Sequence, residues 1–156
     1  VNGLYTAAES CPDTFPNFMH DHPTMLGAFG ILNDKYTDKE IMLNTLKKVL
    51  SDWEFEKKSW GWDFPMVAMT AARLGEPSIA VDALLMDISS NVYLKNGHNT
   101  NLKRPDLPLY LPGNGALLIA VAMMCAGWEG CPPVHAPGFP QDGSWNVKFE
   151  GLNMYP

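Results

Sequence analysis

Five helical segments are predicted along the chain, and they alternate between two kinds. The first, third and fifth are rich in Gly, Ala and Met and have almost no charged face, whereas the second and fourth are amphipathic surface helices. The uncharged helices begin roughly 40–50 residues apart, a repeat length typical of stacked α-hairpins. The sequence therefore predicts an all-α fold of α-hairpin repeats, in a solenoid or a closed toroid, with the uncharged helices inside. The five segments are residues 23–32, 38–53, 64–74, 77–88 and 114–128.

The ends of the predicted helices carry recognisable signals. Thr37 and Glu40 form a capping box in front of the second helix. Asp63 can serve as the N-cap of the third helix, which Gly75 ends. The fifth helix carries no charged residue, so we expect it to be surrounded by protein on all sides.

The loops between these helices are also of two kinds. Those that lead into the uncharged helices are long and rich in polar and aromatic residues. The links from an uncharged helix to its amphipathic partner, NDKYT and GEP, are short. In an antiparallel array of hairpins, all the long loops lie at one end of the molecule. We expect any site at that end, at the N-termini of the uncharged helices.

Composition and charge argue against several classes of function. With 156 residues, of which 46% are hydrophobic, the chain is long enough for a single domain with a sizeable core. Its net charge is −6 and it has no long basic run, which argues against nucleic acid and an anionic membrane surface as partners. The apolar run 116–128 is too short for a helix that spans a membrane.

The cysteines leave the cellular compartment undecided. Cys125 lies in an apolar run and is expected in the core. Cys11 and Cys131 lie in Pro-rich loops and can form a disulfide only if the fold brings them together. No signal peptide is recognisable in this sequence. A periplasmic or secreted location nevertheless stays open.

The segment SWGWDFPM contains the most prominent candidate site residues, Trp60, Trp62 and Asp63. One interpretation is structural: Asp63 caps the helix and the two tryptophans cover its first turn. The other is a sugar site, in which aromatic faces stack on pyranose rings and the carboxylate accepts hydrogen bonds from hydroxyl groups. Capping alone does not require two tryptophans, and both interpretations stay open.

Polar residues in the other long loops extend the candidate site. His20, Asp21 and His22 are consecutive and point in divergent directions, so we expect capping and hydrogen bonding there and no metal site. His98 and Asn114 carry neutral polar groups that suit a hydroxyl-rich ligand, and they can equally satisfy loop backbone. No nucleophile set or phosphate-binding glycine loop is recognisable, and no cofactor is expected.

Residues 131–156 differ from the helical part because they are rich in Pro and Gly. Within them, SWNVKFEGL alternates like a β-strand, with Trp145, Val147 and Phe149 on one side. We expect an irregular, extended C-terminal tail laid over the rest of a single domain of residues 1–156.

Three blocks of the chain together resemble a known family. HDHPTMLGAFGIL, WGWDFPMVAMTAARLGEPSIAVDALL and LPLYLPGNGALLIAVAMMCAG look like the last part of the six-hairpin glycosidases, and most like the inverting α-L-fucosidase family. The resemblance covers residues 15–127. It implies an (α/α)6 toroid, of which this chain holds about the C-terminal half, with a sugar site at the end that carries the long loops.

The chain also departs from the family that it resembles. The relatives' catalytic acid lies in the upstream part of the toroid, and their base region contains the aspartate of a DGN motif. Here Pro112 precedes Gly113 and Asn114, and a proline cannot accept a proton. Asp63 is then the candidate carboxylate within this chain, which is expected to be inactive alone.

Two functions follow as hypotheses. In the first, the chain is the C-terminal part of a glycoside hydrolase, and in the second it is a noncatalytic helical module that binds glycan or packs against another domain. A prenyl-cyclising toroid lacks support because the chain has no DDxxD-like motif. An incomplete toroid exposes the flanks of its inner helices, so we expect association with missing upstream chain or with a second copy. The residues expected in the sugar cleft are His20, His22, Trp60, Trp62, Asp63, His98 and Asn114.

Overall fold

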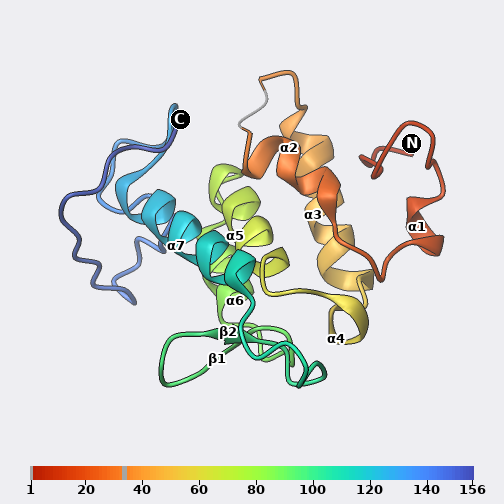
Figure 1. Cartoon of the computed structure of the whole chain (residues 1–156). Helices are drawn as coiled ribbons and strands as arrows, with labels where there is room; N and C mark the ends of the chain where they lie inside the picture. Colours follow the sequence, from red (N-terminus) through yellow and green to blue (C-terminus); the bar gives the residue numbers. More distant parts are fainter. Residues whose placement is uncertain (1, 33–34) are drawn as a thin grey trace.

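The computed structural model describes residues 2–32 and 35–156 and is mostly helical (Figure 1). The two short strands form an antiparallel hairpin, which the sequence pattern did not reveal. The predicted all-α class is confirmed. The elements in chain order are α1 (Thr14–Asn17), the 3-10 turn η1 (Thr24–Leu26), α2 (Gly27–Gly30), α3 (Lys39–Asp52), α4 (Phe55–Lys58), α5 (Asp63–Arg73), α6 (Pro77–Leu84), β1 (Val92–Tyr93), β2 (Asn99–Thr100) and α7 (Leu111–Ala126).

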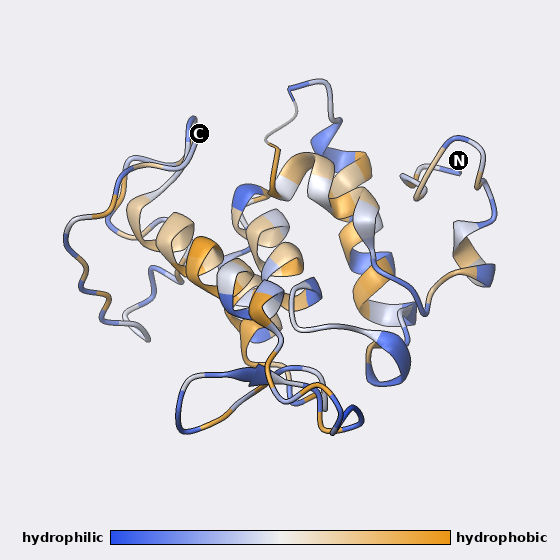
Figure 2. Ribbon diagram, in the orientation of Figure 1, coloured by the Kyte–Doolittle hydropathy of each residue, from blue (hydrophilic) through white to orange (hydrophobic). Residues whose placement is uncertain are grey.

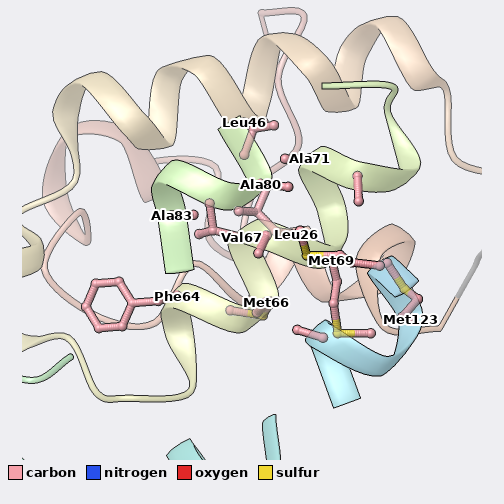
Figure 3. Packing of buried hydrophobic residues seen from close by; sticks show 14 of the residues in the cluster. Leu26, Leu46, Phe64, Met66, Val67, Met69, Ala71, Ala80, Ala83 and Met123 are labelled. Atoms are coloured by element: carbon pink, nitrogen blue, oxygen red, sulfur yellow. The ribbon is translucent and has the colours of Figure 1, made fainter. Parts of the chain in front are cut away.

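Helix α5 lies at the centre of the fold and packs against α2, α6 and α7. Every residue of α5 is buried, which explains why its sequence is dominated by small and apolar side chains. Small residues also allow α2 and α5 to approach each other closely, since a Cβ on Gly30 of α2 would lie 2.2 Å from Thr70 Oγ1 of α5. The three uncharged segments are therefore neighbours. Their shared core includes Leu26, Phe64, Val67, Met69 and Met123 (Figure 3).

Helix α3 is the amphipathic helix that the sequence predicts, but its cap differs. The Asp38 carboxylate accepts hydrogen bonds from the peptide nitrogens of Glu40, at 2.9 Å, and Ile41, at 3.1 Å. The prediction of Thr37 as the capping residue was wrong by one position, because the residue directly before the first helical turn is Asp38. The buried stripe of α3 is formed by Met42, Thr45, Leu46 and Val49.

The bounds of two other helices also differ from the prediction. Helix α6 ends at Leu84 rather than near residue 88, because the Asn91 amide nitrogen donates to the carbonyl oxygens of Leu84 and Met86, at 3.0 Å each. Helix α7 begins at Leu111, with Pro112 in the first turn, where the missing N–H of a proline is harmless. The first change lengthens the loop after α6 and the second shortens the loop before α7, and both predicted segments remain helical.

Helix α7 is not surrounded by protein, and the prediction that it would be was wrong. Ala120, Met123 and Met124 are buried against the core, but Leu118 is 71% exposed and Ile119 is 46% exposed. No described element covers this flank, and α7 contains no charged residue (Figure 2). The apolar flank of α7 is thus open to solvent in the isolated chain.

The C-terminal tail packs on the ends of α5 and α7 but contains no strand at SWNVKFEGL, so that prediction was wrong. Its alternating aromatic residues instead contact other parts of the tail. Phe139 lies against Trp145, with ring centroids 5.5 Å apart, and His135 stacks on Phe149 at 5.3 Å.

The described cysteines are all free thiols. The segment before α1, which contains Cys11, and the segment after α7, which contains Cys131, lie on opposite sides of the molecule (Figure 1). The fold therefore does not bring this pair together. Among the described helices, none has the length and apolar character needed to cross a membrane.

Candidate functional site

Asp63 is the first residue of α5 and is completely buried, with 0% of its surface exposed. The sequence predicted Asp63 as the N-cap, and this prediction was wrong. The helix starts at Asp63 itself, and Trp62 occupies the capping position without a side-chain hydrogen bond to the helix. The Asp63 carboxylate turns back and accepts a hydrogen bond from the Trp60 peptide nitrogen at 2.8 Å. A buried carboxylate at a helix N-terminus is stabilised by the helix dipole and by such peptide N–H donors.

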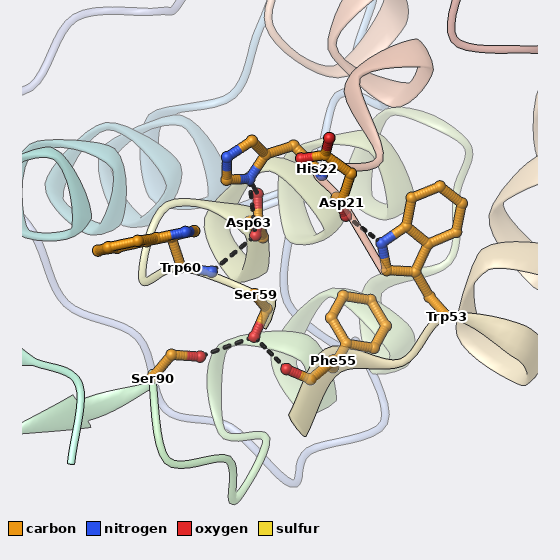
Figure 4. Close-up of polar contacts among 8 residues, drawn as sticks. All are labelled: Asp21, His22, Trp53, Phe55, Ser59, Trp60, Asp63 and Ser90. Carbon is orange, nitrogen blue, oxygen red and sulfur yellow. Dashed lines mark hydrogen bonds and ion pairs between the residues drawn. The ribbon is translucent and has the colours of Figure 1, made fainter. Parts of the chain in front are cut away.

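The second partner of Asp63 is His22, which arrives from the loop before η1. Its Nδ1 lies 2.9 Å from one Asp63 carboxylate oxygen and 3.1 Å from the other (Figure 4). Because an ionised carboxylate only accepts hydrogen bonds, this contact places the ring proton on Nδ1. The other ring nitrogen, Nε2, points away from Asp63, and 27% of the His22 side chain is exposed. His22 therefore gives the buried carboxylate an indirect connection to solvent.

The pKa of Asp63 is raised to about 6 from its ordinary value of 3.8, and the principal cause is burial, which disfavours the charged form. The hydrogen bond from the Trp60 peptide and the contact with His22 act in the opposite direction, because both favour the carboxylate. Burial outweighs them. The result is a carboxyl group that titrates close to neutral pH, as acid–base groups at functional sites often do.

This raised pKa predicts how stability depends on pH. Between pH 3.8 and about 6, the folded state holds a proton on Asp63 that the unfolded chain has lost. The part of the stability that is linked to this proton is therefore complete at low pH and is lost as the pH rises through about 6, whereas the hydrogen bonds to His22 and Trp60 remain. We expect the difference in unfolding free energy between the wild type and Asp63→Asn to fall by about 2 kcal/mol over this window, measured by urea denaturation. A difference that grows with pH would show that burial does not dominate at Asp63.

Aromatic residues surround this pair. The Trp62 ring meets the His22 ring edge to face, with centroids 4.9 Å apart at 70°. The Trp60 ring contacts Tyr110 at 5.0 Å, and the Arg104 guanidinium lies 5.5 Å above the Trp60 ring. Sequence reasoning missed Tyr110 and Arg104. The position of Tyr110 directly before α7, equivalent to that of Trp62 before α5, was the signal that could have found it.

Two pockets flank Asp21 at this end of the molecule. One, of about 400 Å³, is lined by His20 and Trp60 together with Arg104 and neighbouring polar side chains. The other, of about 260 Å³, is lined by His22 and Trp53 and is mostly apolar. His20 and His22 thus face different pockets, and Trp53 Nε1 fixes the segment between them by donating to the Asp21 carbonyl oxygen.

Asn99 joins the N-terminal ends of α5 and α7. Its side chain is fully buried, and a Cβ on either Gly61 or Gly113 would lie within 2.2 Å of Asn99 Oδ1. Its peptide oxygen accepts a hydrogen bond from the Tyr110 nitrogen at 2.8 Å. The long loops that lead into α5 and α7 therefore meet at Asn99, while His22 brings the loop before η1 to the same end.

The remaining predicted residues hold loop backbone. Asn114 Oδ1 accepts from the Asn99 peptide nitrogen at 2.9 Å, and its Nδ2 donates to the Gly97 oxygen at 2.7 Å. The His98 ring lies 3.4 Å from the Asn96 amide nitrogen, in the same hairpin. The structure brings His22, Trp60, Trp62 and Asp63 together. Asn114 instead forms hydrogen bonds with loop backbone, which was the second of the two roles predicted for it.

No group of three or more His, Cys, Asp or Glu side chains within residues 2–32 and 35–156 could hold a metal ion. The chemistry available at the His22–Asp63 pair is hydrogen bonding and proton transfer. No protein-family model matches the chain, and neither curated proteins nor solved structures include a significant match.

Proposed function

We propose that the chain forms one side of a carbohydrate cleft and is the C-terminal part of an (α/α)6 toroid glycoside hydrolase. The observation that supports this best is the buried Asp63 held by His22 beside Trp60 and Trp62, at the end where the long loops meet. The packing of α5 between α2 and α7 is also compatible with inner helices of a toroid.

Asp63 acts through His22 in this proposal, because the carboxylate itself has no exposed surface. Asp63 accepts a hydrogen bond from Nδ1–H and orients the ring, so that Nε2 is available to accept a proton from a sugar hydroxyl or from water. Trp62 Nε1 is buried without a hydrogen-bond partner among the described residues, an unused donor next to the same ring. Buried unpaired donors are uncommon and call for a functional explanation.

Hydrolysis of a glycosidic bond requires two carboxyl groups, one as acid and one as base or nucleophile. In this chain the His22–Asp63 pair takes the part of the base, because the Asp63 carboxylate reaches solvent only through His22, and the carboxyl groups that contact the sugar come from upstream chain in the complete toroid. Pro112, in place of an aspartate before Gly113, removes the other candidate base.

The alternative proposal is a noncatalytic helical module that binds glycan or packs against another domain. The specific observation in its favour is the open apolar flank of α7, where Leu111 is 66% exposed and Leu118 is 71% exposed. Contiguous apolar surface of this kind marks a contact with missing upstream chain or with a second copy. The intact mass of the native gene product separates the two proposals, since a complete toroid requires a much longer chain.

Saturation-transfer NMR with a panel of neutral oligosaccharides tests the sugar cleft. We expect at least one sugar to bind the wild type, and His22→Gln to weaken that binding by about tenfold through loss of the oriented ring. His98→Gln is the matched control, because it removes a histidine from the neighbouring hairpin and is expected to leave affinity within about twofold. Binding of no sugar, or equal losses in both variants, would reject the proposal.

A further inference from the structure

A second pocket lies at the opposite end of α5 from the His22–Asp63 pair. It has a volume of about 690 Å³ and sits between the segment before α3, the C-terminus of α5 and the segment after α7. Asp63 and Arg73 are the first and last residues of α5, so the two ends are about 15 Å apart along the helix axis. Its described lining includes three basic side chains, Lys35, Lys39 and Arg73, and one acidic side chain, Glu129.

Arg73 is the most unusual of these residues because its guanidinium is buried and has no Asp or Glu partner among the described residues. It is only 6% exposed, its Nε donates to the Gly30 carbonyl oxygen at 3.0 Å, and its Nη2 donates to the Pro156 oxygen at 2.9 Å. Nη1 has no hydrogen-bond partner among the described residues. Burial lowers the pKa of Arg73, although the Trp128 and Tyr155 rings lie 6.0 and 5.5 Å from the guanidinium carbon.

The two lysines of the pocket also lack carboxylate partners within the described part of the chain. Lys35 lies over the Tyr36 ring, with its Nζ 5.2 Å from the centroid, and Lys39 lies 5.8 Å from the Phe29 centroid. Lys48 differs from them because its Nζ forms an ion pair with Asp52. Among the described lining residues, three cations face one carboxylate, Glu129, so the pocket has an excess of positive charge although the net charge of the chain is −6. Such clustering raises the local potential and attracts anions.

We propose that this pocket binds a compact oxyanion of the phosphate or sulfate type. Arg73 lines the pocket with a guanidinium held by α2 and the tail, and Lys35 and Lys39 add two ammonium groups on exposed side chains. Arginine and lysine are the usual protein partners of phosphate oxygens. The rings of Phe29 and Trp128 also line the pocket, so they can contact an organic group attached to the anion.

The test is a titration of the whole chain with sodium phosphate, followed by amide NMR at constant ionic strength. We expect saturable shifts at Gly75 and Gly130, which line the pocket, and no comparable shifts at Gly97 in the β-hairpin. Lys39→Gln is expected to weaken phosphate binding by roughly fivefold to tenfold. Lys47→Gln is the matched control, because Lys47 is an exposed lysine on the same helix outside the pocket. The affinity of this variant for phosphate is expected to match that of the wild type.

Phenyl phosphate distinguishes an isolated anion from the anionic group of an organic ligand. Tighter binding than inorganic phosphate would assign an organic phosphate to the pocket, and equal binding would assign the free anion. Arg73→Met removes the guanidinium, but it also removes contacts to α2 and the tail. If the Arg73 variant fails to fold, the Lys39→Gln variant provides the deciding measurement. Shifts that do not saturate, or an equal effect of the Lys47 variant, would mean that Arg73 only ties the tail to α2 and would overturn the proposal.

Discussion

Replacing Asp63 by alanine is expected to lower the free energy of unfolding by about 2–4 kcal/mol. The substitution leaves the Trp60 peptide nitrogen and His22 Nδ1 without their acceptor, and it opens a small cavity at the first turn of α5. Because the carboxylate is fully buried, water cannot replace it without rearrangement. Urea denaturation at neutral pH measures the loss.

The matched control is Asp82→Ala on α6, where the side chain is exposed. We expect this variant to unfold within about 0.5 kcal/mol of the wild type. Equal stability of the two variants would show that Asp63 is not held by His22 and Trp60 in solution. The proposed sugar cleft would then lose its structural basis.

The second large effect is expected at Gly113 in the first turn of α7. A Cβ there would lie 2.2 Å from Asn99 Oδ1, and Asn99 cannot move aside because Gly61 lies against the same amide. We expect Gly113→Ala to destabilise the protein by about 1–3 kcal/mol, in the range typical of overpacking. Because the clash pushes the N-terminal ends of α5 and α7 apart, we also expect it to weaken sugar binding.

Gly115, two residues further along α7, is the control because a Cβ at this position meets no atom within 4 Å. Gly115→Ala is expected to stabilise the protein by about 0.5 kcal/mol, since alanine favours the helix. The two substitutions are chemically identical and should differ in sign. If both stabilise, the close packing of Asn99 between the N-terminal ends of α5 and α7 is absent in solution.

The sequence predicted which segments form helices better than it predicted which faces of those helices are buried. The apolar stripe of α3 and the uncharged composition of α5 follow directly from periodicity, and both helices form as expected. The uncharged composition of α7 led to the prediction of full burial, but composition says nothing about whether the chain contains an element to cover each side. The exposure of Leu118 is therefore a property of the assembled fold.

The sequence predicted several residues of the candidate site but not the contacts between them, because local patterns do not relate separate loops. His22 and Asp63 were each recognised from their place before a helix, but their contact spans two loops that no local pattern relates. Asp63 was expected to cap α5 from outside, whereas the helix begins one residue earlier and buries it. Asn114 was expected in the cleft, and its short amide instead reaches the nearest unpaired backbone groups.

The most direct measurement is the long-range ¹H–¹⁵N spectrum of the histidine side chains, recorded under mildly alkaline conditions where free imidazoles are neutral. We predict that His22 carries its proton on Nδ1, held by Asp63, and that addition of a binding oligosaccharide moves its Nε2 resonance. His98 serves as the internal reference and is expected to remain unchanged. A His22 ring with its proton on Nε2, or one that no sugar affects, would contradict the proposal that Asp63 and His22 form a carbohydrate site.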